Sequence, residues 1–432
     1  MKPQTLRQKE VAELSAKLSP ISEKNVDWIK KNCFAHKGYY SKEEVWCSDC
    51  AHVFPYKSSD VGLKVVCPKC GVTLTIEKSR KKIAFDEKFY VSVFEAKGDY
   101  QVIRHYHVHR QSRKGQGVWV SIIEAVQVWI NCNDGKKTII ARTVQPMSYY
   151  IDAWSFSSDL EIRRETNTYY GSRYTIWSDY ICPGGKYLPK LKRNGYKRSL
   201  SNYVCPSKVI PLLLTNSDVE LLTKTRQYSL LSYFVKKQLV SIPYKHAVNI
   251  CNRNNYIIKD ASMWYDYLGF LDYFKLDTHN AKYVCPENLK EEHDKLMRRK
   301  TRIEEAKELK KKIEQAKAYE EDYKKSKSKY FGICFGNDKI VVTVLQSVAE
   351  FAEEGVSMHH CLFASKYFSK KDALILSAKD KDGNRLETIE VNLKTLSIIQ
   401  SRGICNENSL FHSEIVNLVN KNIKQIRKQA AA

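Results

Sequence analysis

The stretch CSDCAHVFPYKSSDVGLKVVCPKCG, residues 47–71, decides the fold of the part of the chain that surrounds it. It holds two Cys-x-x-Cys pairs separated by sixteen residues, formed by Cys47, Cys50, Cys67 and Cys70. Four thiolates at this spacing are typical of a tetrahedral structural Zn²⁺ site, to which two turns each donate a pair of ligands. The sequence therefore predicts a zinc ribbon over residues 36–80, closed to further ligands and hence not catalytic. A redox dithiol is the alternative, but two matched pairs argue against it.

The bulk composition is that of a soluble protein with several domains. The chain has 432 residues, 43% of them hydrophobic, which is enough for more than one core. Its longest apolar runs are far shorter than the ~18 to 20 residues that cross a bilayer, so no membrane span is predicted. The N-terminus is polar where a secretory signal needs an apolar core, and the predicted location is cytoplasmic. In that compartment the thirteen cysteines are expected to be metal ligands or small buried side chains.

Positive charge is the most distinctive bulk property. There are 72 Lys and Arg against 48 Asp and Glu, a formal net charge of +24 at pH 7. A positive excess of this size is expected of proteins that bind nucleic acid. Lys and Arg side chains neutralise phosphates, and the counterions released from the nucleic acid supply binding affinity. We therefore predict a nucleic acid as the partner, DNA in preference to RNA. The alternatives are acidic protein partners, an anionic membrane surface, or a basic protein with no dedicated site.

Patterns along the rest of the chain predict an α+β multidomain protein. Helical spacing of apolar residues marks the N-terminal segment and returns after residue 205, while short alternating runs between hairpin turns mark an antiparallel sheet. Alternating charge blocks without Gly or Pro predict a long charged helix. The predicted parts are an N-terminal helical segment (1–35), the zinc ribbon (36–80), an antiparallel β domain (81–205), a helical bundle (206–286), a charged helical arm (287–330) and a small C-terminal α/β module (331–432).

Two basic segments are candidates for a nucleic-acid surface. In the predicted β domain, one strand carries Arg104, His105, His107, His109 and Arg110, and its histidines alternate so that they share one face. This face is interpreted as a track for phosphates or a second metal cluster, or else as an ordinary solvated face. The solvated face is favoured over a metal, because three in-line histidines converge poorly on one ion.

The second basic segment is KYLPKLKRNGYKRSL, residues 186–200. It interleaves cations with aromatic rings, a composition suited to phosphates and stacked bases. A solvated basic loop is the alternative. The candidate residues are Lys186, Tyr187, Lys190, Lys192, Arg193, Tyr196, Lys197 and Arg198.

The segment MHHC, residues 358–361, follows a helix that Gly355 is predicted to end and precedes a predicted three-stranded meander. As a metal site it is incomplete, with Cys405 or His412 as a distant third ligand. As a catalytic centre it sets a thiol beside an imidazole that can hold the thiolate. The favoured interpretation is a structural turn. In it Cys361 is a small buried side chain, and His360 forms a hydrogen bond with a backbone carbonyl or with Gln400. The candidate catalytic residues are His359, His360, Cys361, Gln400, Arg402 and Asn406.

The order of MHHC, a strand with ETIEV, then QSRG and an Asn resembles the C-terminal domain of PcfJ-like proteins, which conjugative plasmids, integrative elements and phages encode. With the ribbon and the segments HAVNICNRNNYIIKDASMWYDYLGFL and NAKYVCPENLKEEHD, the chain is similar to long members from Bacteroides-type bacteria. The resemblance places the family motifs at His360 and Cys361, at residues 387–391, at Gln400, Arg402 and Gly403, and at Asn406. It implies an accessory role in the transfer or maintenance of a mobile element.

These observations together predict a nucleic-acid-associated accessory protein of a mobile genetic element, acting in conjugative DNA processing or transfer, with structural Zn²⁺ as its cofactor. One alternative is an enzyme of unknown reaction with a His-Cys centre in the C-terminal module. Another is a protein-interaction scaffold that contacts the proteins of a DNA-transfer machine.

Overall fold

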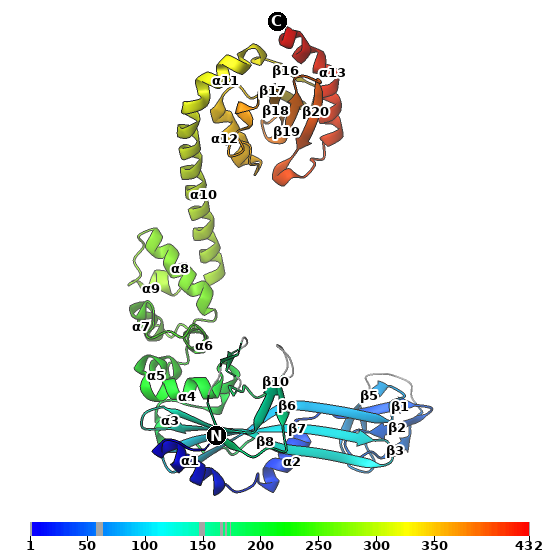
Figure 1. Cartoon of the computed structure of the whole chain (residues 1–432), viewed down its shortest axis with the longest axis vertical. Helices are drawn as coiled ribbons and strands as arrows, with labels where there is room; N and C mark the ends of the chain where they lie inside the picture. The colour runs from blue at the N-terminus through cyan, green and yellow to red at the C-terminus, as the bar shows by residue number, and fades with distance from the viewer. Residues whose placement is uncertain are drawn as a thin grey trace. The chain divides into compact units, whose positions relative to one another are not determined.

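The computed structural model describes residues 2–57, 64–146, 152–164, 167–168, 171–172 and 174–431. The chain divides into two compact units (Figure 1). The first comprises Met1–Leu268 with Lys275–Glu287, and the second comprises Gly269–Phe274 with Asn288–Ala432. Within the described part of the chain, no helix combines the length and apolarity that a membrane crossing requires.

Two helices at the N-terminus pack on the large sheet of the first unit. They are α1 (Leu6–Ala16) and α2 (Glu23–Asn32). Thr5 begins α1 with a capping box, which satisfies backbone donors that the first turn leaves open. Val11 of α1 and Ile29 of α2 are fully buried, each in a cluster with side chains of the long strands. The N-terminal segment is therefore part of the core of this unit.

The ribbon is a five-stranded sheet with the strand order β3-β2-β1-β5-β4. Strands β1 and β5 pair in parallel, and the other neighbours pair antiparallel. Its own core is small and includes Val45, Leu74 and Ile76. The strands are β1 (Lys37–Ser41), β2 (Glu44–Cys47), β3 (Val53–Pro55), β4 (Lys64–Val66) and β5 (Thr73–Lys78).

The large sheet is built on three long antiparallel strands that lie side by side (Figure 1). Their β-branched and aromatic residues favour extended backbone, and Gly98 supplies the positive φ of the first hairpin turn. The order is β12-β9-β8-β7-β6-β15. The strands are β6 (Ile83–Lys97), β7 (Tyr100–Arg113), β8 (Gly117–Asn131), β9 (Lys137–Ala141), β12 (Glu161–Arg163) and β15 (Tyr180–Ile181), with the short pairs β10 (Thr143–Pro146) and β11 (Asp152–Ser155), and β13 (Asn167–Thr168) and β14 (Gly171–Ser172) beside them.

Short helices follow the sheet. Their core includes Trp264, which is fully buried and whose indole N–H donates to the carbonyl of Val284 at 2.9 Å. Asn216 begins α5 by accepting a hydrogen bond from the backbone of Asp218. The helices are α3 (Pro189–Arg193), η1 (Arg198–Asn202), α4 (Pro206–Thr215), α5 (Ser217–Lys224), α6 (Tyr228–Lys236), α7 (Lys245–Arg253), α8 (Ala261–Tyr273) and α9 (Ala281–Val284).

The second unit contains a long charged helical segment, as predicted. Ion pairs between residues three or four apart, such as Lys312 with Glu308, line its surface. It runs as α10 (Leu289–Ala316), η2 (Lys317–Tyr319), α11 (Glu320–Lys327) and η3 (Ser328–Tyr330).

A five-stranded antiparallel sheet with the order β16-β17-β18-β19-β20 forms the centre of the second unit. The predicted meander is its second half. The strands are β16 (Cys334–Gly336), β17 (Ile340–Val344), β18 (Ala373–Asp380), β19 (Arg385–Asn392) and β20 (Ser397–Arg402), with the helices α12 (Val348–Ser357), η4 (Tyr367–Ser369), η5 (Ile404–Asn406) and α13 (His412–Ala431).

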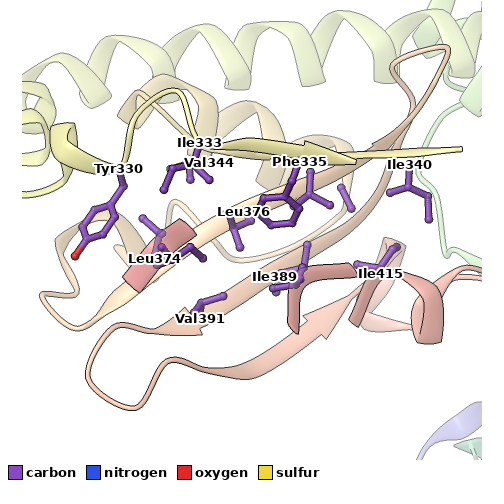
Figure 2. Close-up of a cluster of buried hydrophobic side chains, with 14 residues drawn as sticks. Tyr330, Ile333, Phe335, Ile340, Val344, Leu374, Leu376, Ile389, Val391 and Ile415 are labelled. Carbon is purple, nitrogen blue, oxygen red and sulfur yellow. The ribbon is translucent and has the colours of Figure 1, made fainter. Parts of the chain in front are cut away.

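The two faces of this sheet differ in character. On one face, Leu376 and Ile389 pair across strands and pack with Ile415 of α13 in an apolar core (Figure 2). On the other face, Ser377 pairs with Thr388, and this polar face is turned to α12. Because side chains alternate along a strand, an apolar core and a polar interface lie back to back.

The predicted fold class is confirmed. The structure is α+β with several sheets, a four-cysteine cluster at residues 47–70 and a long helical segment over residues 289–330. The division into six parts stays a prediction. One local expectation is wrong: Gly355 does not end α12, which continues to Ser357. A Cβ at Gly355 would lie 2.9 Å from the carbonyl oxygen of His360, so close approach of the next segment explains this glycine.

Candidate functional sites: a four-cysteine cluster, a basic segment and a His-Cys cavity

The four predicted cysteine ligands meet in space. One ligand atom from each of Cys47, Cys50, Cys67 and Cys70 lies within 4.8 Å of all the others. The sulfur of Cys47 is 3.8 Å from that of Cys70, and the sulfur of Cys50 is 3.6 Å from that of Cys67. These separations fit four thiolates around one ion of tetrahedral preference. In the described part of the chain, no other His, Cys, Asp or Glu group is arranged as a candidate metal site.

Two turns of the same type form the two halves of the cluster. In the first turn the N–H of Ala51 donates to the carbonyl of Cys47, and in the second the N–H of Gly71 donates to that of Cys67, both at 2.9 Å. Ala51 and Gly71 occupy equivalent positions and both have positive φ, 61° and 72°. The N–H of Asp49 also points at the Cys47 sulfur, at 3.3 Å. Backbone donors aimed at a sulfur stabilise its anionic, metal-binding form.

The protonation of these thiols is coupled to metal binding. Burial raises the pKa of Cys47 above its ordinary value and raises the pKa of Cys50 to about 11. Without an ion both thiols therefore carry protons at neutral pH. A metal ion must displace those protons, so binding is expected to release them and to weaken as the pH falls.

Four residues predicted for a nucleic-acid surface are buried instead. Arg104 is 3% exposed and its guanidinium pairs with Glu124 at 2.6 Å and with Glu95 at 2.9 Å. Arg110 is 2% exposed and pairs with Asp49 of the ribbon at 2.9 Å and with Asp86. Both arginines therefore hold elements together within the first unit and do not face solvent phosphates.

The two neighbouring histidines are buried as well. His105 is 1% exposed and is bonded through Nδ1 to the hydroxyl of Ser92 at 2.8 Å, and burial lowers its pKa to about 3. The ring of His107 is buried with its centroid 4.8 Å from that of Phe156. The interpretation of Arg104, His105, His107 and Arg110 as a phosphate track is thus corrected. Earlier segments cover the two arginines, and later segments cover the two histidines.

In the second basic segment most of the cationic side chains are exposed, whereas the two aromatic rings pack against other rings. The rings of Tyr187 and Tyr196 pack in tilted geometry, with centroids 5.4 Å from each other and 5.2 and 6.2 Å from that of Phe94. Tyr196 is buried and Tyr187 is half-buried, so both rings belong to the packing of the first unit. The ammonium of Lys190 donates to the carbonyl of Cys132 at 2.8 Å. The remaining predicted side chains, Lys186, Lys192, Arg193, Lys197 and Arg198, are exposed.

Five residues of the predicted catalytic set, from two regions of the sequence, line one cavity of about 160 Å³ in the second unit. They are His360, Cys361, Gln400, Arg402 and Asn406, and the cavity is also lined by Ser365, Tyr367, Thr388 and Glu390. His359 is not in this lining; it is exposed and has a positive φ of 54°. The two adjacent histidines thus differ in position, and only His360 belongs to the cavity.

Backbone contacts fix His360 in place. Its N–H donates to the carbonyl of Gly355 at 2.8 Å, and its ring Nε2 donates to the carbonyl of Gly403 at 2.7 Å. A proton on Nε2 leaves Nδ1 as the acceptor in the neutral ring. The predicted carbonyl partner of His360 is present, but Cys361 is exposed and not buried as the structural interpretation expected.

A carboxylate outside the predicted catalytic set also lines the cavity. Glu390 is 5% exposed, and its oxygens accept from Lys370 at 2.9 Å and from the Gln400 amide at 2.8 Å. Although burial opposes it, the hydrogen bond with Glu390 raises the pKa of Lys370. Thr388 and Glu390 alternate with buried apolar residues on β19, and this polar alternation was the available signal.

The cavity unites a thiol, an imidazole, a buried carboxylate and a cation. Arg402 donates to Asn408 at 2.9 Å and has no ion pair among the residues that are described. Such groups in one small hollow suit the binding of a polar ligand and nucleophilic chemistry at Cys361. The predicted distant ligand His412 is bonded to Glu387 at 3.0 Å, so it belongs to another network.

In that second network, Glu387 of β19 contacts side chains in β20 and in the segment that follows it. Its carboxylate is fully buried and accepts from Ser409, from Ser401 and from His412. Although burial opposes it, these hydrogen bonds lower the pKa of Glu387 below its ordinary 4.5. Because the folded-state pKa is the lower one, the stabilisation is present above about pH 5 and is lost as the pH falls through the folded-state value.

We therefore expect acid to destabilise the second unit through Glu387. In calorimetry of the full chain, the transition temperature of this unit should fall as the pH is lowered from about pH 5 through the folded-state pKa of Glu387. The Glu387→Gln variant should start lower at pH 7 and depend less on pH. The exposed Glu407→Gln variant is the control and should keep the wild-type pH dependence; an equally steep curve for Glu387→Gln would refute the assignment.

Among the comparisons with known proteins, one family model matches the region that holds the cavity. No curated protein matches the chain. No solved structure matches it either. The match with the PcfJ-like family begins within α8 and includes every residue that lines the cavity, so the resemblance predicted from the sequence is confirmed there. The family model described as PcfJ-like protein matches residues 263–416 of the chain.

Proposed function

We propose that this protein binds nucleic acid as an accessory protein of a mobile genetic element, in the processing or transfer of conjugative DNA. The observation that carries this proposal is the exposed row of cations between residues 186 and 198. No acidic side chain of the described ranges pairs with any of the five exposed ones, although many cations elsewhere in the first unit are paired, such as Lys37 with Glu77. Cations on a short segment without acidic partners contribute to the +24 net charge and can be neutralised by phosphates.

The remaining parts of the proposal have separate supports. The PcfJ-like match supports the connection with mobile elements, and the proposed location is the cytoplasm, where DNA and the proteins of a transfer machine are accessible. We assign Zn²⁺ to the four-cysteine cluster, because zinc prefers four thiolates in tetrahedral geometry. The ion would stabilise the ribbon, which Arg110 anchors to the large sheet.

Charge removal in the basic segment tests the binding surface. Replacing Lys186, Lys192, Arg193, Lys197 and Arg198 by glutamine should weaken binding to single- and double-stranded DNA. It should also flatten the plot of log K against log salt by up to about 4.5 for duplex and up to about 3.5 for single strands, since each neutralised phosphate contributes about 0.9 or about 0.7. Fluorescence anisotropy with labelled DNA measures both quantities.

The matched control removes five exposed cations from the charged helix of the second unit. These are Arg302, Lys307, Lys310, Lys311 and Lys325, which lie among acidic residues. The control has the same net charge as the first variant, so it should retain most of the affinity. Equal losses in the two variants would show that net charge acts without a defined surface, and no loss in either would contradict the proposal.

The His-Cys cavity favours a second candidate, an enzyme acting on nucleic acid or a nucleotide. Its support is the convergence of His360, Cys361 and Glu390 in one hollow. Incubated DNA and RNA strands should then be cleaved or modified on a denaturing gel by wild type and by the Cys334→Ala control, but not by Cys361→Ala. Cys334 is another exposed cysteine of the same unit. Intact strands with wild-type protein under all metal conditions would contradict this candidate.

A further inference from the structure

At the end of the large sheet that carries the β7–β8 hairpin, one face contacts the ribbon and the other face is exposed. The hydroxyl of Ser112 donates to the carbonyl of Ser48 at 2.5 Å, and the N–H of Gly115 donates to the carbonyl of Ala51 at 2.9 Å. Together with Arg110, these contacts fasten one face of the β7–β8 hairpin to the ribbon, which lies at this end of the strands (Figure 1). Because side chains alternate along a strand, the odd-numbered residues of β7 here point to the other face.

That other face exposes a row of aromatic rings. Phe85 of β6 is 63% exposed and Trp119 of β8 is 59% exposed. The ring of His109 on β7 lies between them, with its centroid 6.0 Å from that of Phe85 and 5.6 Å from that of Trp119. Large apolar side chains exposed in a contiguous group are uncommon on a free surface and mark a binding site.

A groove of about 300 Å³ continues the row beside Trp119. Arg113 and the amides of Gln111 and Gln116 line it, and its lining contains no acidic side chain. In one orientation of its amide, Gln111 accepts from the guanidinium of Arg113 at 3.1 Å. The groove thus offers a cation for a phosphate and amide groups for a base edge, next to a ring on which a base can stack.

We propose that Phe85, His109 and Trp119 form a stacking surface for unpaired bases, so that single-stranded nucleic acid is a ligand of this sheet. The inference rests on the proposed function and adds a strand preference and a site to it. A protein partner would use the rings as apolar contacts, but the cation and amides beside Trp119 complement a sugar-phosphate chain with exposed bases. Paired bases cannot stack on these rings, so the surface discriminates against duplexes.

Variants that stay apolar but lack a π-face test this surface. The Phe85→Leu/Trp119→Leu double variant should bind single-stranded DNA and RNA at least about tenfold more weakly. Its affinity for duplex and the salt dependence of binding should stay near wild type, because no cation is lost. Trp119→Phe should retain most of the affinity, since phenylalanine also stacks.

The outcomes separate the inference from the proposed function. If wild type binds neither single strands nor duplex, the proposed function fails. If wild type binds single strands and the double leucine variant binds them equally well, only the stacking surface is refuted. Circular dichroism checks folding, which should be retained because both rings are exposed. Photocrosslinking of wild type to a single strand provides a second measurement: adducts should map to β6–β8, and adducts confined to other segments would refute the site.

Discussion

Replacing Cys50 by serine is expected to abolish stoichiometric metal binding and to unfold the ribbon. The four sulfurs form two cross-paired contacts, and the ribbon has only a small apolar core of its own. Structural zinc sites of this kind hold about 10 kcal/mol or more of binding free energy, and that energy is folding energy where no site exists in the unfolded chain. Loss of one thiolate therefore removes the main stabilisation of residues 37–78.

The measurement is metal content per chain by mass spectrometry, with hydrogen exchange over the ribbon. Wild type should carry one zinc ion and protect the amides of β1, β2 and β5, whereas Cys50→Ser should do neither. Cys334→Ser is the control, because Cys334 is exposed and lies in the second unit. A protected ribbon in chelator-treated, metal-free wild type would show that the four cysteines are not a structural metal site.

Replacing Glu354 by glutamine is expected to destabilise the second unit by about 3 kcal/mol. The carboxylate is fully buried on α12 and accepts from Arg385 at 2.6 Å. It also accepts from the hydroxyls of Ser377 and Thr388 at 3.1 and 2.8 Å. An amide in its place removes the charge and turns an N–H group toward donors, leaving buried groups without partners.

Pulse proteolysis in urea, with mass spectrometry of the C-terminal fragments, measures the free energy of unfolding of this unit. The control is Glu353→Gln on the same helix, because Glu353 is 45% exposed and lies 3.7 Å from Arg385. An exposed pair of this kind contributes within about 1 kcal/mol. Equal effects of the two substitutions would show that the buried network does not position α12 over the sheet.

Local patterns in the sequence predicted the parts of the structure that local chemistry determines. The cysteine spacing predicted the cluster because two knuckles determine their own geometry through backbone bonds within five residues. The charged helix followed from a run without breakers. For the cavity, the family resemblance named His360, Cys361 and Gln400, although no pattern in the sequence shows that residues forty positions apart meet.

The errors arose where tertiary contacts decide burial. Alternation along β7 predicted that the histidines share one face, but it could not show that Ser178 and Phe156 cover His105 and His107 while His109 stays partly exposed. The basic segment was similar: its cations are exposed, but its tyrosines pack on Phe94. Glu390 was left out of the predicted catalytic set because a carboxylate in a strand is ordinarily solvated, whereas here Lys370 and Gln400 bond to it.

The most direct test of the central claim is a titration of the purified chain with single- and double-stranded DNA and RNA of one sequence. It should be measured by anisotropy from about 50 mM to about 200 mM salt. The account predicts saturable binding that weakens steeply with salt and is tighter for single strands than for duplex. Absence of binding at the lowest salt would contradict nucleic-acid association and would leave a protein-interaction scaffold as the function to test.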